Sequence, residues 1–264
     1  MDLNLKGKVV MITGAAGMRG SIGETMLRAL AEEGAIPAII DRNDRGYTYV
    51  EELKAGGIDA HFVKTDVTQP DQIKKAVEEI IEKYQRIDAV INNVGVNDGV
   101  GLDATCEAFV RSLQLNLISY WLVVKYALPQ LKISKGNILN IGSKVGLTGQ
   151  GGTSGYAASK GGVLALTREW AVDLIGDEIR VNAIVIAESW TPAYDNWIKT
   201  LENGAEKLEN IVKQIPFQNR MTTPAEIAAN ALFIISDKSS HTTGQFVFVD
   251  GGYVHLDRSL LPGN

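Results

Sequence analysis

The sequence predicts an α/β domain in which a doubly wound parallel sheet lies between two layers of helices, giving three αβα layers. Short apolar, β-branched runs alternate along the chain with longer stretches that have helical periodicity. The 264 residues are 45% hydrophobic, which is enough for a sizeable core, and no linker or internal repeat divides them. We therefore expect residues 1–264 to form a single domain.

The first strand and the first helix flank a glycine-rich loop. Residues 8–13 form an apolar, partly β-branched run that predicts a buried strand. Four glycines lie within residues 14–23, and residues 24–33 predict a helix that ends at Gly34. Glycines let the backbone approach a pyrophosphate, and the helix N-terminus stabilises the anion. This order of elements is typical of Rossmann-type dinucleotide binding.

The second predicted strand, residues 35–40, is followed directly by Asp41. A carboxylate at this position can accept the two ribose hydroxyls of an adenosine and would repel a 2′-phosphate, which favours NAD. Arg42 comes next and could bind that phosphate, so NADP stays open as the second cofactor. The alternative interpretation is that Asp41 is only a turn residue at the end of a strand.

The remaining chain continues the alternation, and this predicts a parallel sheet covered on both faces. The later candidate strands are residues 60–65, 89–92, 136–141, 180–186 and 245–249. The longest apolar stretch, residues 113–128, is short for a membrane span and contains Asn116 and Lys125. We expect it to form a buried helix.

Charge and cysteine content exclude several classes of function. The formal charge is −5 with a pI near 5.3, and no basic cluster is present, which argues against nucleic acid or an anionic membrane as partner. A lone cysteine, Cys106, and a start without signal-peptide features predict a cytoplasmic protein. The three histidines, His61, His241 and His255, are scattered, so we expect no metal site.

Tyr156 and Lys160 lie four residues apart in a predicted helix. Side chains at this spacing share one helix face, so the ammonium can stabilise the phenolate and lower its pKa toward the working range. Such a pair can transfer protons. The alternative is an ordinary Tyr/Lys pair on a solvated face, and the neighbouring motifs argue against it.

The spacing of Asn116, Ser143, Tyr156 and Lys160 resembles the Asn-Ser-Tyr-Lys tetrad of the short-chain dehydrogenase/reductase family. The resemblance covers nearly the whole chain. Further landmarks follow in order: Thr13-Gly14, Asp66, Asn92-Asn93-Val94-Gly95, Val181-Asn182-Ala183, Thr191-Pro192 and Val249-Asp250-Gly251-Gly252.

The resemblance implies a role for each member of the tetrad. Tyr156 would take the alcohol proton while a hydride moves to the nicotinamide. Lys160 would lower the pKa of Tyr156 and bind the nicotinamide ribose. Ser143 would orient the substrate oxygen, and Asn116 would anchor a water relay to Lys160.

The resemblance also implies a set of cofactor contacts along the carboxyl edge of the sheet. These are Gly14, Gly17, Arg19, Gly20, Ser21, Ile22, Asp41, Arg42, Asp66, Val67, Asn93, Val94, Gly95, Tyr156, Lys160, Ser189 and Thr191. Two departures from the family pattern affect them. Ser21 stands where a glycine is common, and Ile186-Ala187 stands where the family has Pro-Gly.

Residues 96–103, 148–156, 166–172 and 248–258 resemble bacterial L-fucose dehydrogenases, which oxidise the anomeric hydroxyl of a 6-deoxy sugar to a lactone. The small-molecule sugar would be bound by Asn97, Ser143, Gln150, Tyr156, Glu188 and Trp190. A hydroxysteroid or a 3-oxoacyl thioester is the alternative substrate. A non-catalytic cofactor-binding protein is a third interpretation, which the intact tetrad disfavours.

Two segments are expected to close the site. Residues 188–217 predict a substrate lid with aromatic side chains among charges. Residues 250–264 form a C-terminal tail that, as in relatives, would cover its own site or a neighbour's. The apolar stretches 113–128 and 164–174 are more hydrophobic than one covered face requires, and the resemblance implies a homotetramer.

Overall fold

A seven-stranded parallel sheet forms the centre of the protein in the computed structural model, which describes residues 2–257. The strand order is β3-β2-β1-β4-β5-β6-β7, so the direction of winding reverses between β1 and β4. The strands are β1 Val9–Thr13, β2 Ile36–Asp41, β3 His61–Lys64, β4 Ala89–Asn92, β5 Asn137–Ser143, β6 Arg180–Ile186 and β7 Phe246–Val249. Each predicted strand is present, with ends within two residues of the prediction.

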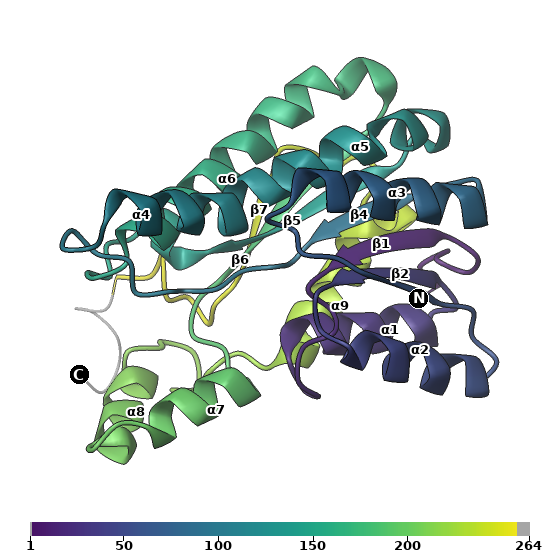
Figure 1. The fold of residues 1–264 in the computed structure, drawn as a ribbon. Helices are drawn as coiled ribbons and strands as arrows, with labels where there is room; N and C mark the ends of the chain where they lie inside the picture. The colour runs from purple at the N-terminus through teal and green to yellow at the C-terminus, as the bar shows by residue number, and fades with distance from the viewer. Residues whose placement is uncertain (1, 258–264) are drawn as a thin grey trace.

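Helices cover both faces of this sheet (Figure 1). One apolar core packs α1, α2 and α9 against one face, and a second packs α3, α5 and α6 against the other. The long helices are α1 Ile22–Glu32, α2 Arg45–Ala55, α3 Pro70–Tyr84, α4 Cys106–Leu113, α5 Ser119–Ser134, α6 Ser154–Asp173, α7 Pro192–Lys199, α8 Gly204–Lys213 and α9 Pro224–Ile235. The predicted three-layer α/β class is confirmed.

The first helix begins at Ile22, two residues before the predicted start. Ser21 caps it, because its hydroxyl accepts a hydrogen bond from the Glu24 N–H at 3.4 Å. Ser21, which stands where the family commonly has a glycine, therefore has a structural role as the helix cap, because it binds the free Glu24 N–H. The backbone N–H groups of this first turn stay at the carboxyl edge of β1.

Residues 113–128, which were expected to form a buried helix, are helical throughout, but the helix is not a regular α-helix in its first part. Residues Gln114–Ile118 form a π-helix, η1, before α5 begins at Ser119. A π-turn holds one more residue than an α-turn and is frequent at functional sites. Asn116 lies at this turn and is fully buried, so the irregularity directs an amide toward the interior.

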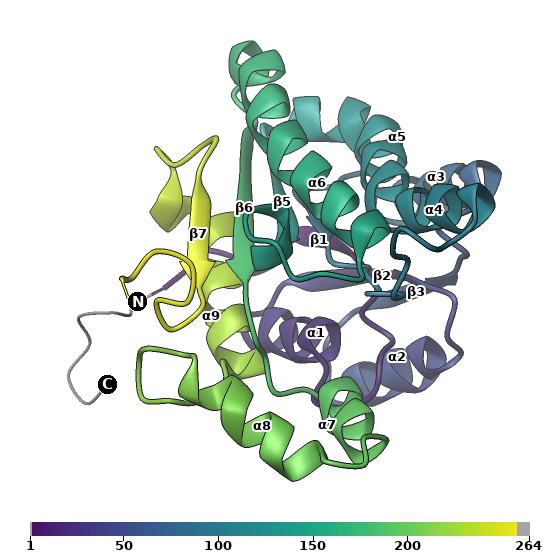
Figure 2. The same ribbon diagram turned by 90° about the vertical axis from the view of Figure 1, so that its left-hand side faces the viewer.

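The lobe formed by α7 and α8 stands beyond the carboxyl ends of the strands, apart from the two helical layers (Figures 1 and 2). It falls within the predicted lid, residues 188–217. The Phe217 N–H donates to the Gly251 carbonyl at 2.9 Å, which joins the end of this lobe to the turn after β7. Asp250 holds that turn by accepting from the N–H groups of Gly252 and Val254. Residues 258–264 of the predicted tail lie outside the described residues.

Candidate active site

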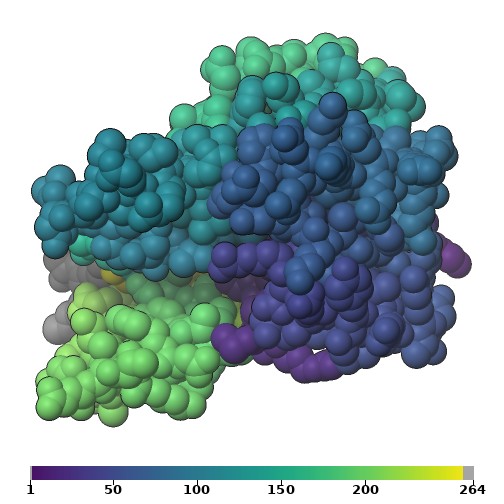
Figure 3. Space-filling view, viewed as in Figure 1, coloured from purple at the N-terminus to yellow at the C-terminus, as the bar shows by residue number. Residues whose placement is uncertain are grey.

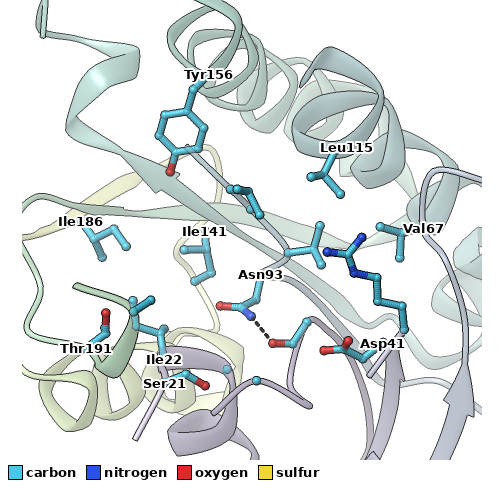
Figure 4. A pocket seen from close by; sticks show the side chains of 18 of the residues that line it. Ser21, Ile22, Asp41, Val67, Asn93, Leu115, Ile141, Tyr156, Ile186 and Thr191 are labelled. Atoms are coloured by element: carbon cyan, nitrogen blue, oxygen red, sulfur yellow. Dashed lines mark hydrogen bonds between the residues drawn. The ribbon is translucent and has the colours of Figure 1, made fainter. Parts of the chain in front are cut away.

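A cavity of about 340 Å³ opens at the carboxyl ends of the strands, where the strand order reverses. Pockets for small ligands commonly have this size and position. Most residues predicted to contact a cofactor line it: Gly14, Gly17, Ser21, Ile22, Asp41, Arg42, Asp66, Val67, Asn93, Val94, Gly95, Tyr156, Lys160 and Thr191. Figure 4 shows Tyr156 and Asp41 at opposite ends of the cavity, with Asn93 between them. The surface is hollowed between the α7–α8 lobe and the α4 side of the molecule (Figure 3).

Three predicted cofactor residues do not line this cavity. The Arg19 guanidinium forms an ion pair with Glu52 on α2. The Gly20 N–H donates to the Glu24 carboxylate at 3.0 Å. Ser189 is buried, and its hydroxyl has no hydrogen-bond partner among the described residues.

The cavity wall also contains residues that the prediction missed. These are Gly23, Thr65, Val96, Leu115, Ile141, Gly142, Ile186 and Ala193. Gly23 was identifiable from its place in the glycine-rich loop. The others are ordinary residues at strand ends and on helices, and only the topology places them together.

Close backbone packing explains the glycines of the loop. Gly14 has a φ of +71°, which favours glycine, and a Cβ there would lie 2.9 Å from Val94. A Cβ on Gly23 would lie 2.3 Å from the Gly14 carbonyl oxygen and 2.6 Å from Nδ2 of Asn93. The same Asn93 amide donates to the carbonyls of Thr13 and Gly14 (Figure 4). The loop is therefore fixed with its backbone exposed to the cavity, which fits a pyrophosphate.

Asp41 provides acceptors at the other end of the cavity. Its two oxygens accept backbone N–H groups from Ala16 at 2.9 Å and from Asn43 at 3.0 Å. A carboxylate has about four lone-pair positions, so two remain for ribose hydroxyls. Arg42 lines the same end, so both residues that bear on the choice between NAD and NADP are in place.

Tyr156 projects its hydroxyl into the cavity (Figure 4). Burial raises the pKa of Tyr156 to about 12, and a hydrogen bond with Ser143 opposes the rise. This direction is the opposite of the sequence-based expectation that Lys160 would bring the pKa down. Desolvation of the phenolate by burial is the larger effect, and it outweighs the hydrogen bond with Ser143.

Lys160 lies on the same helix and is 2% exposed. Its ammonium donates to the Ile141 carbonyl at 2.7 Å and to the Tyr120 hydroxyl at 3.0 Å, and lies 5.7 Å from the centre of the Tyr156 ring. Burial lowers the pKa of Lys160 to about 7. The side chain therefore gains or loses a proton near neutral pH.

Tyr120 is a residue of the site that sequence reasoning missed. Its hydroxyl accepts from Lys160 and donates to the Val94 carbonyl at 2.8 Å. Burial raises its pKa well above the usual value, so it stays a neutral phenol. It lies in the apolar stretch 113–128 that was expected to form a buried helix, and no sequence pattern indicates that its hydroxyl binds Lys160.

Asn116 supports the strand-end segment that borders the cavity. Its side chain accepts from the Val96 N–H at 2.8 Å and donates to the Val96 and Ser112 carbonyls, each at 3.1 Å. A Cβ on Gly95 would lie 3.3 Å from the Lys160 ammonium and 3.6 Å from Oδ1 of Asn116. The glycine therefore allows the amide and the ammonium to lie close together behind the cavity.

The predicted substrate residues divide into two groups. Tyr156 lines the cavity, and Ser143 lies outside its wall but forms a side-chain hydrogen bond with Tyr156. Asn97 and Gln150 are exposed on loops and lie outside its wall. Glu188 lines a neighbouring cavity of about 450 Å³, and Trp190 lines an apolar groove of about 520 Å³ against α8.

Two further properties bound the chemistry. Within residues 2–257, no three His, Cys, Asp or Glu side chains are grouped as a metal site would need. No helix among those residues combines the length and apolar character of a bilayer span.

Comparison with known proteins gives a consistent result. A family model described as enoyl-(acyl carrier protein) reductase matches residues 14–254. The L-fucose dehydrogenase of Mus musculus is 36% identical over 249 residues, 93% of this chain and 88% of that protein. The 3-oxoacyl-(acyl-carrier-protein) reductase of Thermotoga maritima is 35% identical over 257 residues, covering 96% of this chain and 100% of that protein. The crystal structure of Cj0485 dehydrogenase aligns with a TM-score of 0.93 at 42% identity, covering 99% of both chains.

The fold, the cavity and these relatives define the class. The chain belongs to the short-chain dehydrogenase/reductase family of oxidoreductases, whose cofactor is a nicotinamide dinucleotide.

Proposed function

We propose that the protein is an NAD(P)-dependent dehydrogenase that oxidises the anomeric hydroxyl of L-fucose or a related aldose to a lactone. The observation that carries the reaction type is the pairing of Tyr156 and Ser143 at a cavity whose far end holds a glycine cradle and Asp41. The similarity to L-fucose dehydrogenases supports the substrate class.

In this mechanism, Tyr156 is the general base that accepts the proton of the substrate hydroxyl. The Ser143 hydroxyl orients the substrate oxygen and stabilises charge on it. A bound nicotinamide supplies the hydride acceptor. Phenolate and ammonium stabilise each other in a site with little water, so ionisation of Tyr156 is coupled to protonation of Lys160. Tyr120 holds the ammonium in place throughout.

NAD is the proposed cofactor. Asp41 keeps two acceptor positions for the adenosine ribose, and its charge opposes a 2′-phosphate. Arg42 is a neighbouring cation that could bind the 2′-phosphate, so NADP would still bind, but more weakly than NAD. Thr191 lines the cavity and would bind the carboxamide at the nicotinamide end. The buried Ser189 hydroxyl, which has no hydrogen-bond partner among the described residues, lies two residues before Thr191 and would join it after a small rearrangement.

A second candidate is the reduction of a 3-oxoacyl thioester. The reductase of Thermotoga maritima has nearly the same identity to this chain as the L-fucose dehydrogenases, which favours this candidate over other apolar substrates such as hydroxysteroids. The absence of a basic cluster in the sequence, which an acidic carrier protein would need, argues against it.

Assembly and location are parts of the same proposal. Exposed apolar side chains on α4, α5 and α6 support a homotetramer: Val110 is 50% exposed, Trp121 44% and Val172 72%. The lone Cys106 supports a cytoplasmic setting.

The test is a turnover assay. The purified protein is incubated with NAD or NADP and with aldoses, cyclic secondary alcohols, steroids or 3-hydroxyacyl thioesters, while absorbance of the reduced cofactor is followed. Oxidation of L-fucose or a related aldose with the highest kcat/KM is the expected result. Turnover of other alcohols without any sugar would replace the substrate assignment, and no turnover at all would favour a non-catalytic cofactor-binding protein.

A further inference from the structure

Four side chains connect the turn after β5, the α7–α8 lobe and the turn after β7. Lys144 directly follows Ser143, and its ammonium forms an ion pair with Glu188. The Tyr194 hydroxyl on α7 donates to the other Glu188 oxygen at 3.0 Å. The ring of Tyr253, in the turn after β7, lies 4.0 Å from the Lys144 ammonium. One charged pair thus contacts all three segments.

Burial of this pair is unusual. The Lys144 side chain is 9% exposed and the Glu188 side chain 16% exposed. Lysine and glutamate are rarely buried, because the loss of hydration offsets their mutual attraction, and a buried ion pair is therefore a weak source of stability. A site that must recognise polar atoms gives a better reason for this pair to lie next to Ser143.

The pair has hydrogen-bonding capacity to spare. An ammonium has three donors, and Glu188 takes one of them within the described part of the chain. A carboxylate has about four acceptor positions, of which Lys144 and Tyr194 occupy two. Glu188 and Tyr253 line the cavity of about 450 Å³, whose wall also carries the amides of Asn203, Asn210 and Gln214. The spare acceptors of Glu188 thus lie at the border of a cavity with several amide groups, and Lys144 contacts Glu188 and Tyr253 from behind that wall.

We propose that Lys144 and Glu188 are specificity-determining residues, which bind the hydroxyls of the substrate ring away from the reacting carbon. The inference rests on the proposed sugar dehydrogenase function. Tyr194 and Tyr253 hold the lobe and the turn after β7 around the same hydroxyls. A substrate without ring hydroxyls leaves the polar atoms of the pair unmatched, and a site built for hydrogen bonds discriminates strongly against such a substrate.

The experiment compares L-fucose with 2-hydroxytetrahydropyran, which has the same reacting hemiacetal and no other ring hydroxyls. Lys144→Met and Glu188→Gln are expected to lower kcat/KM for L-fucose by about tenfold or more, chiefly through KM. Activity on 2-hydroxytetrahydropyran is expected to change by less than about threefold, since its transition state does not use the pair. Lys144→Arg should recover part of the lost preference, because it restores the charge and the donors.

Two controls separate recognition from structure. Lys135→Met removes a lysine from an exposed ion pair with Glu178, and should leave both substrates unchanged. The Kd of NAD, measured by fluorescence, should be the same in every variant, because Lys144 and Glu188 do not line the cofactor cavity. Where Lys144→Met fails to fold, the near-isosteric Glu188→Gln provides the same comparison.

Each outcome is decisive. A wild-type protein that oxidises no sugar overturns the proposed function. A wild-type protein that oxidises L-fucose, with variants that lose both substrates equally or neither, overturns the role of the pair and leaves the function intact. A selective loss of the preference for L-fucose supports both.

Discussion

Replacing Lys160 with methionine tests the electrostatics of the site through the stability of the fold. The ammonium has a pKa near 7 in the folded protein, compared with 10.5 for a free lysine, because it is desolvated. Between these two values the unfolded chain holds a proton that the folded protein lacks. Unfolding free energy must therefore rise with pH across this window.

The magnitude follows from the size of the shift. One pKa unit corresponds to about 1.4 kcal/mol, so the group adds at most about 1.4 kcal/mol of unfolding free energy per pH unit. Over the whole window, from about 7 to 10.5, the ceiling is about 5 kcal/mol. Methionine has a similar length and no titratable proton, so Lys160→Met should remove this contribution. It also removes the hydrogen bonds to Ile141 and Tyr120, and this loss lowers the unfolding free energy by about the same amount at each pH.

The assay is urea unfolding at several pH values between about 7.5 and 9.0, at least about one pH unit below the usual pKa of tyrosine in the unfolded chain. The wild-type protein should gain stability over this range relative to Lys160→Met, and the difference between the two should grow with pH. Lys135→Met, whose lysine is exposed, should run parallel to the wild type. Parallel curves for the wild type and Lys160→Met would refute a desolvated ammonium at this position.

Two further predictions concern the cofactor. Gly23→Ala places a Cβ 2.3 Å from the Gly14 carbonyl, so the Kd of NAD should rise by about tenfold or more. The control Gly176→Ala has open space around its Cβ and should bind NAD normally. Calorimetry measures both Kd values, and equal values would contradict the role of the glycine-rich loop as a cofactor cradle. Asp41→Ser removes the charge that opposes a 2′-phosphate, so the ratio of kcat/KM for NAD over NADP should fall by about tenfold; an unchanged ratio would mean that Asp41 does not select the cofactor.

Much of the fold was predictable because the signals are local. Apolar runs gave all seven strands, and the alternation with helices gave the parallel topology. The start of α1 was placed late, because the cap at Ser21 depends on a single hydroxyl. The π-turn at Asn116 was missed for another reason. The Asn116 side chain at this turn bonds to Val96, which is distant in sequence, and no local pattern indicates such a contact.

The candidate site was predictable where motif and topology coincide. Tyr156, Lys160, Asp41 and the glycine cradle lie at the cavity, because each follows or faces a strand end. The direction of the Tyr156 pKa was not predictable from spacing, since helical neighbours show the charge and not the burial that opposes it.

Contacts between distant segments were also beyond the reach of the sequence. Tyr120 occurs in an apolar stretch, so the sequence does not indicate its contact with Lys160. No sequence pattern singles out Lys144 either, because its neighbours Glu188, Tyr194 and Tyr253 come from distant parts of the chain. Trp190, expected to cover a sugar, lines an apolar groove beside α8, and its predicted role stays a prediction.

The most direct measurement is the oxidation rate of Tyr156→Phe, with the Kd of NAD determined on the same sample. The substitution removes only the hydroxyl, and the ring still fills its place beside Lys160. We expect kcat to fall by at least about a hundredfold, as for loss of a general base, while NAD binds nearly as in the wild type. Oxidation at an undiminished rate would contradict the assignment of Tyr156 as the base.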